Sequence, residues 1–220
     1  MSYPTEEEQR ADCVRAMGPE LGGVFHELGR ELSWLHIKWQ QQVALFGTSE
    51  EHIDIANEAA ASFFYIVQNS LWEDTLLHIA RLTEKTETMG NKKWKNLTLL
   101  QLPTLVRVEL QESITILAQK VSLSTEFAQD WRKRHIAHRD FDLAMNRSAK
   151  PLEGASGSKV RDALDAMAAL MNEVDREYRD SETRFEPIPP REGAEALLDV
   201  LREGLGAIER RQKKEREEWE

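Results

Sequence analysis

Apolar side chains recur at helical spacing along most of the chain. Over residues 19–46 they stand three and four positions apart, at Leu21, Val24, Leu28, Leu32, Leu35, Trp39 and Val43. The rhythm resumes over residues 53–83, and no proline lies between Pro19 and Pro103 to interrupt it. The pattern therefore predicts two long helices, the first of which stops near Gly47. Capping-box spacing places helix starts at Thr5 with Glu8 and at Thr48 with Glu51.

The second half of the chain contains shorter predicted elements, separated by loops. Residues 84–96 are polar and contain a glycine, which predicts a loop. Residues 97–121 combine strand-like alternation with helical spacing, and we favour helix because a lone strand would have no partner. Ser124 caps the next predicted helix, which continues to about Asp142. A break over residues 146–158 precedes a helix over 160–171, and a proline-rich turn precedes a last helix that starts near Arg191.

These elements predict an all-α fold, an antiparallel bundle of long helices with additional C-terminal helices. We expect the bundle to occupy residues 1–145 and a C-terminal helical extension, residues 146–220, to pack on or beside it. The last helix ends in RRQKKEREEWE, which has no apolar stripe and is typical of a solvated helix end. Trp34 and Trp39 are typical of core or interface positions.

Composition narrows the class of protein. With 40% apolar and 31% charged residues, the chain can bury a core and is not disordered by composition. The single Cys13 excludes a disulfide framework and a cysteine-rich zinc site. No apolar run approaches the ~20 residues that cross a bilayer, and the N-terminal MSYPTEEEQR lacks the apolar region of a secretory signal. We expect a soluble, cytoplasmic protein with no membrane partner.

The formal net charge of −10 is unevenly distributed. Residues 1–90 carry a net charge of −9 and residues 151–220 a net charge of −6, whereas residues 91–150 carry +5. A local field can matter more than the total charge, so an anionic partner would meet this basic middle region.

The basic region contains the segment WRKRHIAHRDFD at residues 131–142. Its cationic and titratable side chains are Arg132, Lys133, Arg134, His135, His138 and Arg139. Arginine forks bind phosphate, and histidine can exchange a proton near neutral pH. An arginine and a histidine suffice to cleave RNA without a metal. The histidine moves the proton of the 2′-hydroxyl or of the leaving oxygen, and the arginine stabilises the charge on the phosphorane.

Helical spacing leaves the arginine partner of His138 open. On one helix, Arg132 and His138 would lie about 120° apart, whereas Arg134 and His138 would share a face. His138 and Asp142 would share a face too. His135, His138 and Asp142 have a spacing that can hold a metal, but no cysteine or second histidine pair accompanies them, so we expect no metal and no other cofactor.

Other polar residues suggest supporting roles. Asp74, His78, Arg81 and Lys85 form a stripe that either faces solvent or, together with Asp142, orients His138 and lines a cleft. In the predicted loop, Trp94 stands among Lys92, Lys93 and Lys95. It either stacks on an unpaired base or packs back onto the bundle.

Three segments together resemble the HEPN superfamily, and in particular its abortive-infection branch. The first is Arg132, five intervening residues and His138, within RKRHIAHRD; the others are LWEDTLLHIARLTEK at 71–85 and NLTLLQL at 96–102. The resemblance covers roughly residues 20–145. It implies a metal-independent RNase that dimerises, builds one cleft from two Arg–His pairs, and acts in phage defence or as a toxin with an antitoxin.

The chain departs from the family pattern at two positions. Lys133 follows the arginine, where many active members have a small polar residue, and Asp140 stands where some toxins have a tyrosine that a partner enzyme modifies. The resemblance implies that His138 and Arg132 are catalytic. Residues that would bind the substrate are Arg134, Arg139, Lys133 and His135.

The sequence thus predicts an RNA endonuclease, and its status as an enzyme stays open. One alternative is a non-catalytic module that binds RNA, a nucleotide or a partner protein through the same residues. Another is a purely structural helical dimer, in which the basic segment is only a solvated face.

Overall fold

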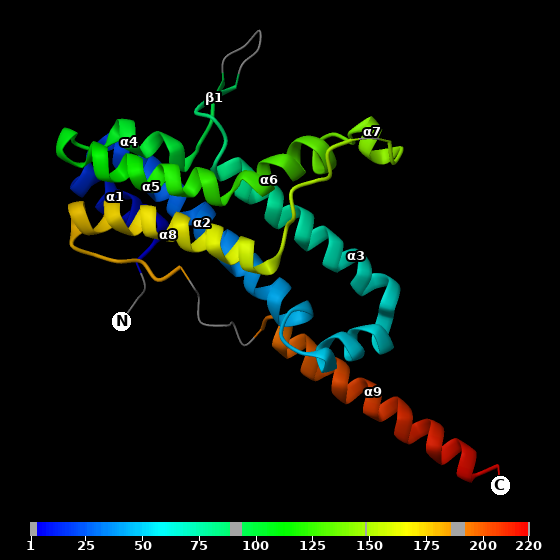
Figure 1. Cartoon of the computed structure of the whole chain (residues 1–220). Helices are drawn as coiled ribbons and strands as arrows, with labels where there is room; N and C mark the ends of the chain where they lie inside the picture. Colours follow the sequence, from blue (N-terminus) through cyan, green and yellow to red (C-terminus); the bar gives the residue numbers. More distant parts are fainter. Residues whose placement is uncertain (1–3, 89–93, 148, 186–191, 220) are drawn as a thin grey trace. The chain divides into compact units, whose positions relative to one another are not determined.

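The computed structural model describes residues 4–88, 94–147, 149–185 and 192–219, and these are mostly helical (Figure 1). The longer helices are α1 (Glu6–Met17), α2 (Pro19–Phe46), α3 (Glu50–Leu82), α5 (Gln111–Ser124), α8 (Gly157–Arg179) and α9 (Ala194–Glu217). Shorter elements are η1 (Leu99–Gln101), α4 (Leu102–Leu105), η2 (Val108–Leu110), α6 (Glu126–Trp131), η3 (Arg132–Ile136) and α7 (Phe141–Ala144). The predicted all-α class is confirmed.

Contacts divide the chain into two compact units. Unit 1 comprises residues 1–36 and 75–186, and unit 2 comprises residues 37–74 and 187–220. Helices α2 and α3 therefore contribute one part to each unit, and α8 belongs to the same unit as α5. The predicted boundary at residue 145 separates two continuous segments, whereas each compact unit consists of two separate stretches of the chain. The domain division stays a prediction.

The core of unit 1 is built from the apolar stripes that the sequence indicates. Leu28, Leu32 and Leu35 of α2 are fully buried, as is Leu76 of α3. Helices α5 and α8 pack along each other (Figure 1), and the buried side chains of α8 are Val160, Ala163, Leu164, Ala166, Met167, Leu170, Met171 and Val174. Burial of each valine, leucine or methionine side chain among them stabilises the unit by roughly 1.5–3 kcal/mol.

Helix α1 packs closely on the start of α2. The capping box of Thr5 and Glu8 is present: Glu8 N donates to Thr5 Oγ1 over 3.3 Å, and Thr5 N donates to Glu8 Oε2 over 2.7 Å. A Cβ atom at Gly22 would lie 2.5 Å from the carbonyl oxygen of Cys13. Any larger residue at position 22 would force the two helices apart. The Cys13 side chain is buried.

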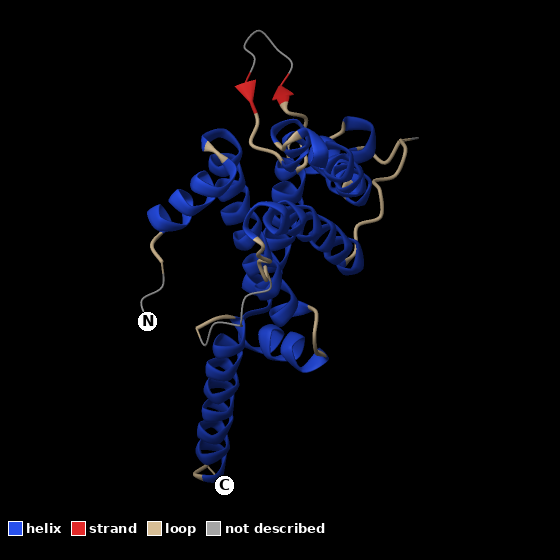
Figure 2. Ribbon diagram, turned by 90° about the vertical axis from the view of Figure 1, so that its left-hand side faces the viewer, coloured by secondary structure: helices blue, strands red, loops and turns tan. Residues whose placement is uncertain are grey.

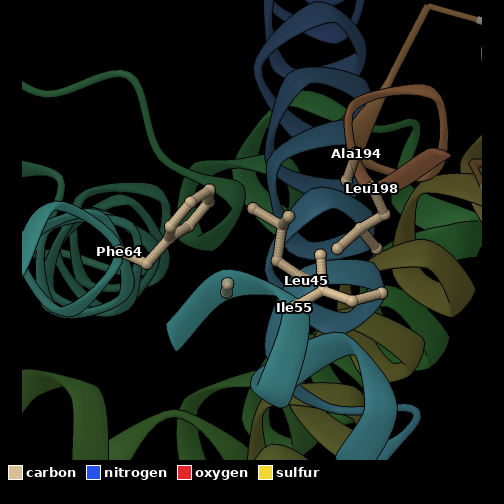
Figure 3. Packing of buried hydrophobic residues seen from close by; sticks show 6 residues of the cluster. Leu45, Ile55, Phe64, Ala194 and Leu198 are labelled. Carbon is tan, nitrogen blue, oxygen red and sulfur yellow. The ribbon is translucent and has the colours of Figure 1, made fainter. Parts of the chain in front are cut away.

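Unit 2 has a smaller apolar core (Figure 3). Side chains from the end of α2, the first half of α3 and the start of α9 meet there, namely Leu45, Ile55, Ala56, Phe64, Ala194 and Leu198. Within the helical span of α3, Ala60 has non-helical backbone angles, φ −167° and ψ 70°. The predicted helix from 48 to 83 is thus interrupted at Ala60.

The predicted loop over residues 84–96 contains a short hairpin (Figure 2). Strands β1 (Glu87–Thr88) and β2 (Trp94–Lys95) pair antiparallel, with Glu87 opposite Lys95. Lys92, Lys93 and the side chain of Trp94 lie outside the described residues.

The stretch 97–124 is helical, as favoured, but in pieces. Pro103 stands in the first turn of α4, where its missing N–H costs no hydrogen bond, and Val106 is extended at the end of that helix. Three-residue turns precede α4 and α5. The alternation of Val106, Val108 and Leu110 forms no strand, as the preference for helix predicts.

The predicted helix from Ser124 to Asp142 was wrong in its extent. Ser124 ends α5, α6 runs from Glu126 to Trp131, and a π-helical turn continues it to Ile136. Residues 137–140 leave the helix before the single turn of α7. The cause is local: the Asp140 carboxylate accepts from Leu143 N and caps α7, so it competes with continued helix.

Candidate functional site

The basic segment 131–142 begins in a π-helical turn. Helix α6 passes into η3 at Arg132, and Ala137 N donates to the carbonyl oxygen of Arg132 over 2.9 Å, one residue further than in an α-helix. Such turns are rare, and they often occur at functional sites. His138 follows this turn in a bend, so the helical-wheel relation between His138 and Arg132, Arg134 or Asp142 does not apply.

Arg132 lies in the wall of an open pocket of unit 1, which we call the Arg132 pocket. The pocket has a volume of about 280 Å³ and is lined by Glu31, Arg81, Leu82, Glu84, Asn96, Leu97 and Arg132. Helices α2 and α3, the segment after β2 and the π turn all contribute. The Arg132 side chain is 33% exposed. Arg132 is thus partly buried while its guanidinium remains accessible from the pocket.

Each arginine of the Arg132 pocket pairs with a carboxylate. Arg132 Nη1 donates to Glu84 Oε2, and Arg81 Nη2 donates to Glu31 Oε2 over 3.1 Å. His78 Nε2 lies 2.8 Å from the same Glu31 oxygen. The two arginines and two glutamates of the pocket wall therefore have formal charges that sum to zero.

The stripe predicted on α3 is divided by the structure. Arg81 lines the Arg132 pocket, and His78 is buried behind it, where it contacts Glu31. Asp74 instead forms an ion pair with Lys38 in unit 2. Two of the predicted supporting residues, His78 and Arg81, therefore share a carboxylate partner.

His138 is exposed after the π turn. Its ring makes no hydrogen bond or ion pair with the part of the chain that the structure describes, and it is not among the residues that line the Arg132 pocket. An exposed imidazole is available to exchange protons with a bound ligand.

Arg134 differs from its neighbours because its donors are already occupied. Its Nε donates to Asp140 Oδ2 over 3.1 Å, and its Nη2 donates to the carbonyl oxygen of Lys150 over 2.5 Å. Nη1 lies 3.4 Å from the Pro151 carbonyl oxygen and 3.6 Å from Asp130 Oδ1. The hydrogen bond that Arg134 donates to Asp140 raises the pKa of the Arg134 guanidinium. Arg134 therefore joins the π turn to residues 150–151, in the connection that precedes α8.

The connection before α8 is held to the same turn by two further hydrogen bonds. Trp131 Nε1 donates to the Glu153 carbonyl oxygen over 2.8 Å, and Glu153 N donates to Asp130 Oδ2 over 2.9 Å. The predicted break over residues 146–158 ends earlier than expected, because α8 begins at Gly157. Residues 150–153 lie against the basic segment.

The remaining candidate residues lie around this segment. The His135 ring contacts Trp131 edge to face at 5.2 Å, and Lys133 and Arg139 are exposed. Asp142 pairs with Arg147, their atoms 3.7 Å apart. Arg147 also lies over the Phe141 ring. Asp142 is therefore engaged with α7 and the residue that follows it.

Sequence reasoning missed Glu31, Glu84 and Asn96 in the Arg132 pocket. Glu31 carries no motif of its own within α2. Glu84 could have been predicted from the sequence, because it stands three residues after Arg81 within the segment that resembles the family.

The described residues contain neither a candidate metal site nor a candidate membrane span. No group of three or more His, Cys, Asp or Glu side chains could hold a metal ion there. Among the described helices, none is both long and apolar enough to span a membrane.

Comparison with known proteins identifies one family. The family model HEPN_AbiU2, described as AbiU2, matches residues 18–197, which include Arg132, His138 and every residue that lines the Arg132 pocket. No curated protein matches the chain significantly, and no solved structure does. Because the family model spans most of the chain, this protein belongs to the AbiU2 family of HEPN proteins.

Proposed function

We propose that this protein is a metal-independent RNA endonuclease that acts in phage defence or as the toxin of a toxin–antitoxin pair. The observation that supports the proposal best is the arrangement at the π turn, where Arg132 reaches an open pocket and the exposed His138 follows six residues later. Family membership supports the abortive-infection setting.

Arg132 would stabilise the negative charge that develops on the phosphorane oxygens. A guanidinium offers two parallel N–H donors to a phosphate, and the partly buried position of Arg132 strengthens such contacts. Loss of one such donor typically lowers kcat by about 10²–10³.

His138 would transfer the proton. The RNA 2′-hydroxyl loses its proton as its oxygen attacks phosphorus, and the 5′-oxygen of the next nucleotide gains one as it leaves. The products are a 2′,3′-cyclic phosphate and a 5′-hydroxyl, so no water is consumed in this step. One histidine can take the first proton or supply the second, and the His138 of a second copy could perform the other transfer.

Neighbouring cations would hold the flanking RNA. Lys133 and Arg139 are exposed beside the catalytic pair, and His135 lies next to Trp131. Arg134 would act mainly through the position of the π turn, because Asp140 and the carbonyl oxygens of Lys150 and Pro151 occupy its donors.

The test is cleavage of RNA in the presence of EDTA by the wild type and by the variants Arg132→Ala and His138→Ala. We expect cyclic-phosphate products from the wild type and at least a ~10²-fold lower rate from each variant. Arg161→Ala, at an exposed arginine of α8, is the control and should retain full activity. Activity that persists in both site variants, or that EDTA abolishes, would refute the assignment.

A non-catalytic module is the second candidate, and the ion pair of Arg132 with Glu84 favours it, because a carboxylate already occupies the arginine. A non-catalytic module should bind RNA at low salt and release it as the salt concentration rises, and the RNA should stay uncleaved. Growth of a bacterial host after induction distinguishes the two candidates. An active RNase should slow growth and its His138→Ala variant should not. For a non-catalytic module, the wild type and the variant should affect growth equally.

A further inference from the structure

The Arg132 pocket has a part, around Arg81, whose chemistry does not suit a phosphate. Arg81 Nη2 lies 3.1 Å from Glu31 Oε2, so an anion bound to Arg81 would meet the Glu31 carboxylate. The two side chains together offer hydrogen-bond donors and acceptors without net charge. This part of the pocket therefore suits a neutral ligand that both donates and accepts hydrogen bonds.

The Arg132 pocket also offers apolar surface. Leu82 and Leu97 line it, and Leu97 is 40% exposed. The volume of about 280 Å³ lies just below the ~300–1,000 Å³ of pockets that hold drug-sized ligands. A planar ring with polar edges fits these features. In single-stranded RNA the bases are such rings, and proteins bind them by hydrogen bonds on the edges and by packing on the faces.

Hydrogen bonds to the end of α3 hold the pocket wall in place. Thr98, which is fully buried, donates from Oγ1 to the Leu82 carbonyl oxygen over 2.9 Å. Gln129 Nε2 donates to the Ala80 carbonyl oxygen over 2.8 Å. A wall that is already ordered loses little conformational freedom when a ligand binds.

The Glu31 carboxylate is fixed by contacts to one of its two oxygens. His78 Nε2 lies 2.8 Å from Oε2, and Arg81 Nη2 donates to the same oxygen. Oε1 makes no hydrogen bond with the residues that the structure describes, and the Glu31 side chain is 37% exposed. Glu31 can therefore accept hydrogen bonds from a ligand in the pocket.

Guanine is the base whose edges match Glu31 and Arg81. Its N1–H and N2 amino groups are neighbouring donors that a carboxylate accepts, and its O6 and N7 atoms are acceptors that an arginine fork binds. These two edges meet between N1 and O6, so their protein partners must lie side by side, as Glu31 and Arg81 do. Adenine, cytosine and uracil each present one donor group with an acceptor directly beside it.

We propose that the Arg132 pocket binds one guanine base of single-stranded RNA. Glu31 accepts from N1–H and from the N2 amino group, and Arg81 donates to O6 and N7. The proposal rests on the proposed function for RNA as the ligand, but it does not require that the RNA is cleaved. Where cleavage occurs, Arg132 in the same wall places the cut beside that guanosine.

Fluorescence anisotropy with the full-length His138→Ala protein tests this proposal. The probes are labelled uridine octamers whose central position is uridine, guanosine, inosine or 7-deazaguanosine. We expect the guanosine octamer to bind at least about tenfold more tightly than the all-uridine octamer. Inosine lacks the N2 amino group and 7-deazaguanosine lacks N7, so each should bind at least about threefold more weakly than guanosine.

Substitutions in the pocket assign each contact to a side chain. Glu31→Gln should bind the guanosine, inosine and uridine octamers equally, and Arg81→Gln should not distinguish guanosine from 7-deazaguanosine. Glu27→Gln is the matched control. Glu27 also contacts a histidine and an arginine of α2, His26 Nδ1 at 3.3 Å and Arg30 Nη1 at 3.2 Å, but it does not line the pocket. This variant should retain the full preference for guanosine.

Equal binding of the guanosine and uridine octamers would overturn the proposal, and so would a guanosine preference that Glu31→Gln leaves undiminished. If a pocket variant fails to fold, the inosine and 7-deazaguanosine octamers still decide, because they leave the protein unchanged. Incubation of the octamers with the wild type separates this proposal from the RNase assignment. Guanosine-dependent binding without cleavage refutes only the RNase, and cleavage without any base preference refutes only the guanine pocket.

Discussion

Arg132 and Glu84 form an ion pair in the wall of the Arg132 pocket, with their side chains 33% and 23% exposed. If Arg132 binds an RNA phosphate as proposed, Glu84 competes with that phosphate for the guanidinium. Glu84→Gln removes the negative charge and keeps the size of the side chain. We expect it to tighten RNA binding by about two- to fivefold at low salt, the size of one surface ion pair.

Fluorescence anisotropy with labelled RNA measures this change, in a His138→Ala background that leaves the RNA intact. Glu109→Gln, at an exposed glutamate of η2, is the matched control and should have a smaller effect. If Glu84→Gln binds RNA no more tightly than this control, Glu84 does not compete with phosphate for Arg132.

Arg134 joins the π turn to the connection that precedes α8. The Arg134→Gln variant loses the contacts to Asp140 and to the carbonyl oxygens of Lys150 and Pro151. We expect faster hydrogen exchange at the amides of Ala137 and Asp140, whose N–H groups donate to the carbonyl oxygens of Arg132 and Arg134.

Mass spectrometry or NMR follows that exchange. Lys133→Gln, at the exposed neighbouring position, should leave it unchanged. Equal exchange in the two variants would mean that Arg134 does not hold the turn.

Asp140 makes the stability of this region depend on pH. The backbone N–H of Leu143, and after it the Arg134 guanidinium, lower the pKa of the Asp140 carboxyl. A lowered pKa in the folded state stabilises the fold above the unfolded pKa, near 3.9, and this stabilisation is lost as pH falls through the folded value.

The Asp140→Asn variant retains a good helix cap and removes the charge. We expect its melting temperature to be lower than that of the wild type at pH 7, and the difference to shrink below about pH 3.9 and vanish as pH falls through the lowered pKa of Asp140. Thermal unfolding across that pH range checks this. If the difference in melting temperature persists at the lowest pH at which the protein folds, it comes from the shape of the asparagine side chain and not from the lost charge.

Gly22 permits the close approach of α1 and α2. A methyl group at this position would meet the Cys13 carbonyl carbon at 2.6 Å and the Val14 Cα atom at 2.6 Å, and both are backbone atoms that cannot turn aside. We expect Gly22→Ala to reduce the free energy of unfolding by about 1–3 kcal/mol.

Gly23 is the matched control, since its nearest neighbour would be the end of the Arg10 side chain at 3.9 Å. Gly23→Ala should stabilise the protein by up to ~1 kcal/mol, because alanine is the better helix former. Denaturant unfolding of both variants measures the two effects. Equal effects would mean that α1 can shift away from α2.

The sequence alone determined the all-α class and most helix positions, because apolar spacing records which face of a helix is buried. That spacing predicts a buried helix face with Leu28, Leu32 and Leu35, and all three are fully buried. The motif of Arg132 and His138, and the capping box of Thr5 and Glu8, are also local features that a sequence can display.

Only the tertiary structure decided how the candidate site is assembled. Helical spacing favoured Arg134 as the partner of His138, but the helix ends at Ile136, and Arg134 binds Asp140 and the connection at 150–151. The Arg132 pocket depends on Glu31 and Glu84, which lie far from Arg132 in the chain. Such pairs form because folding brings distant helices together, and no local pattern encodes which ionic partner each side chain will meet.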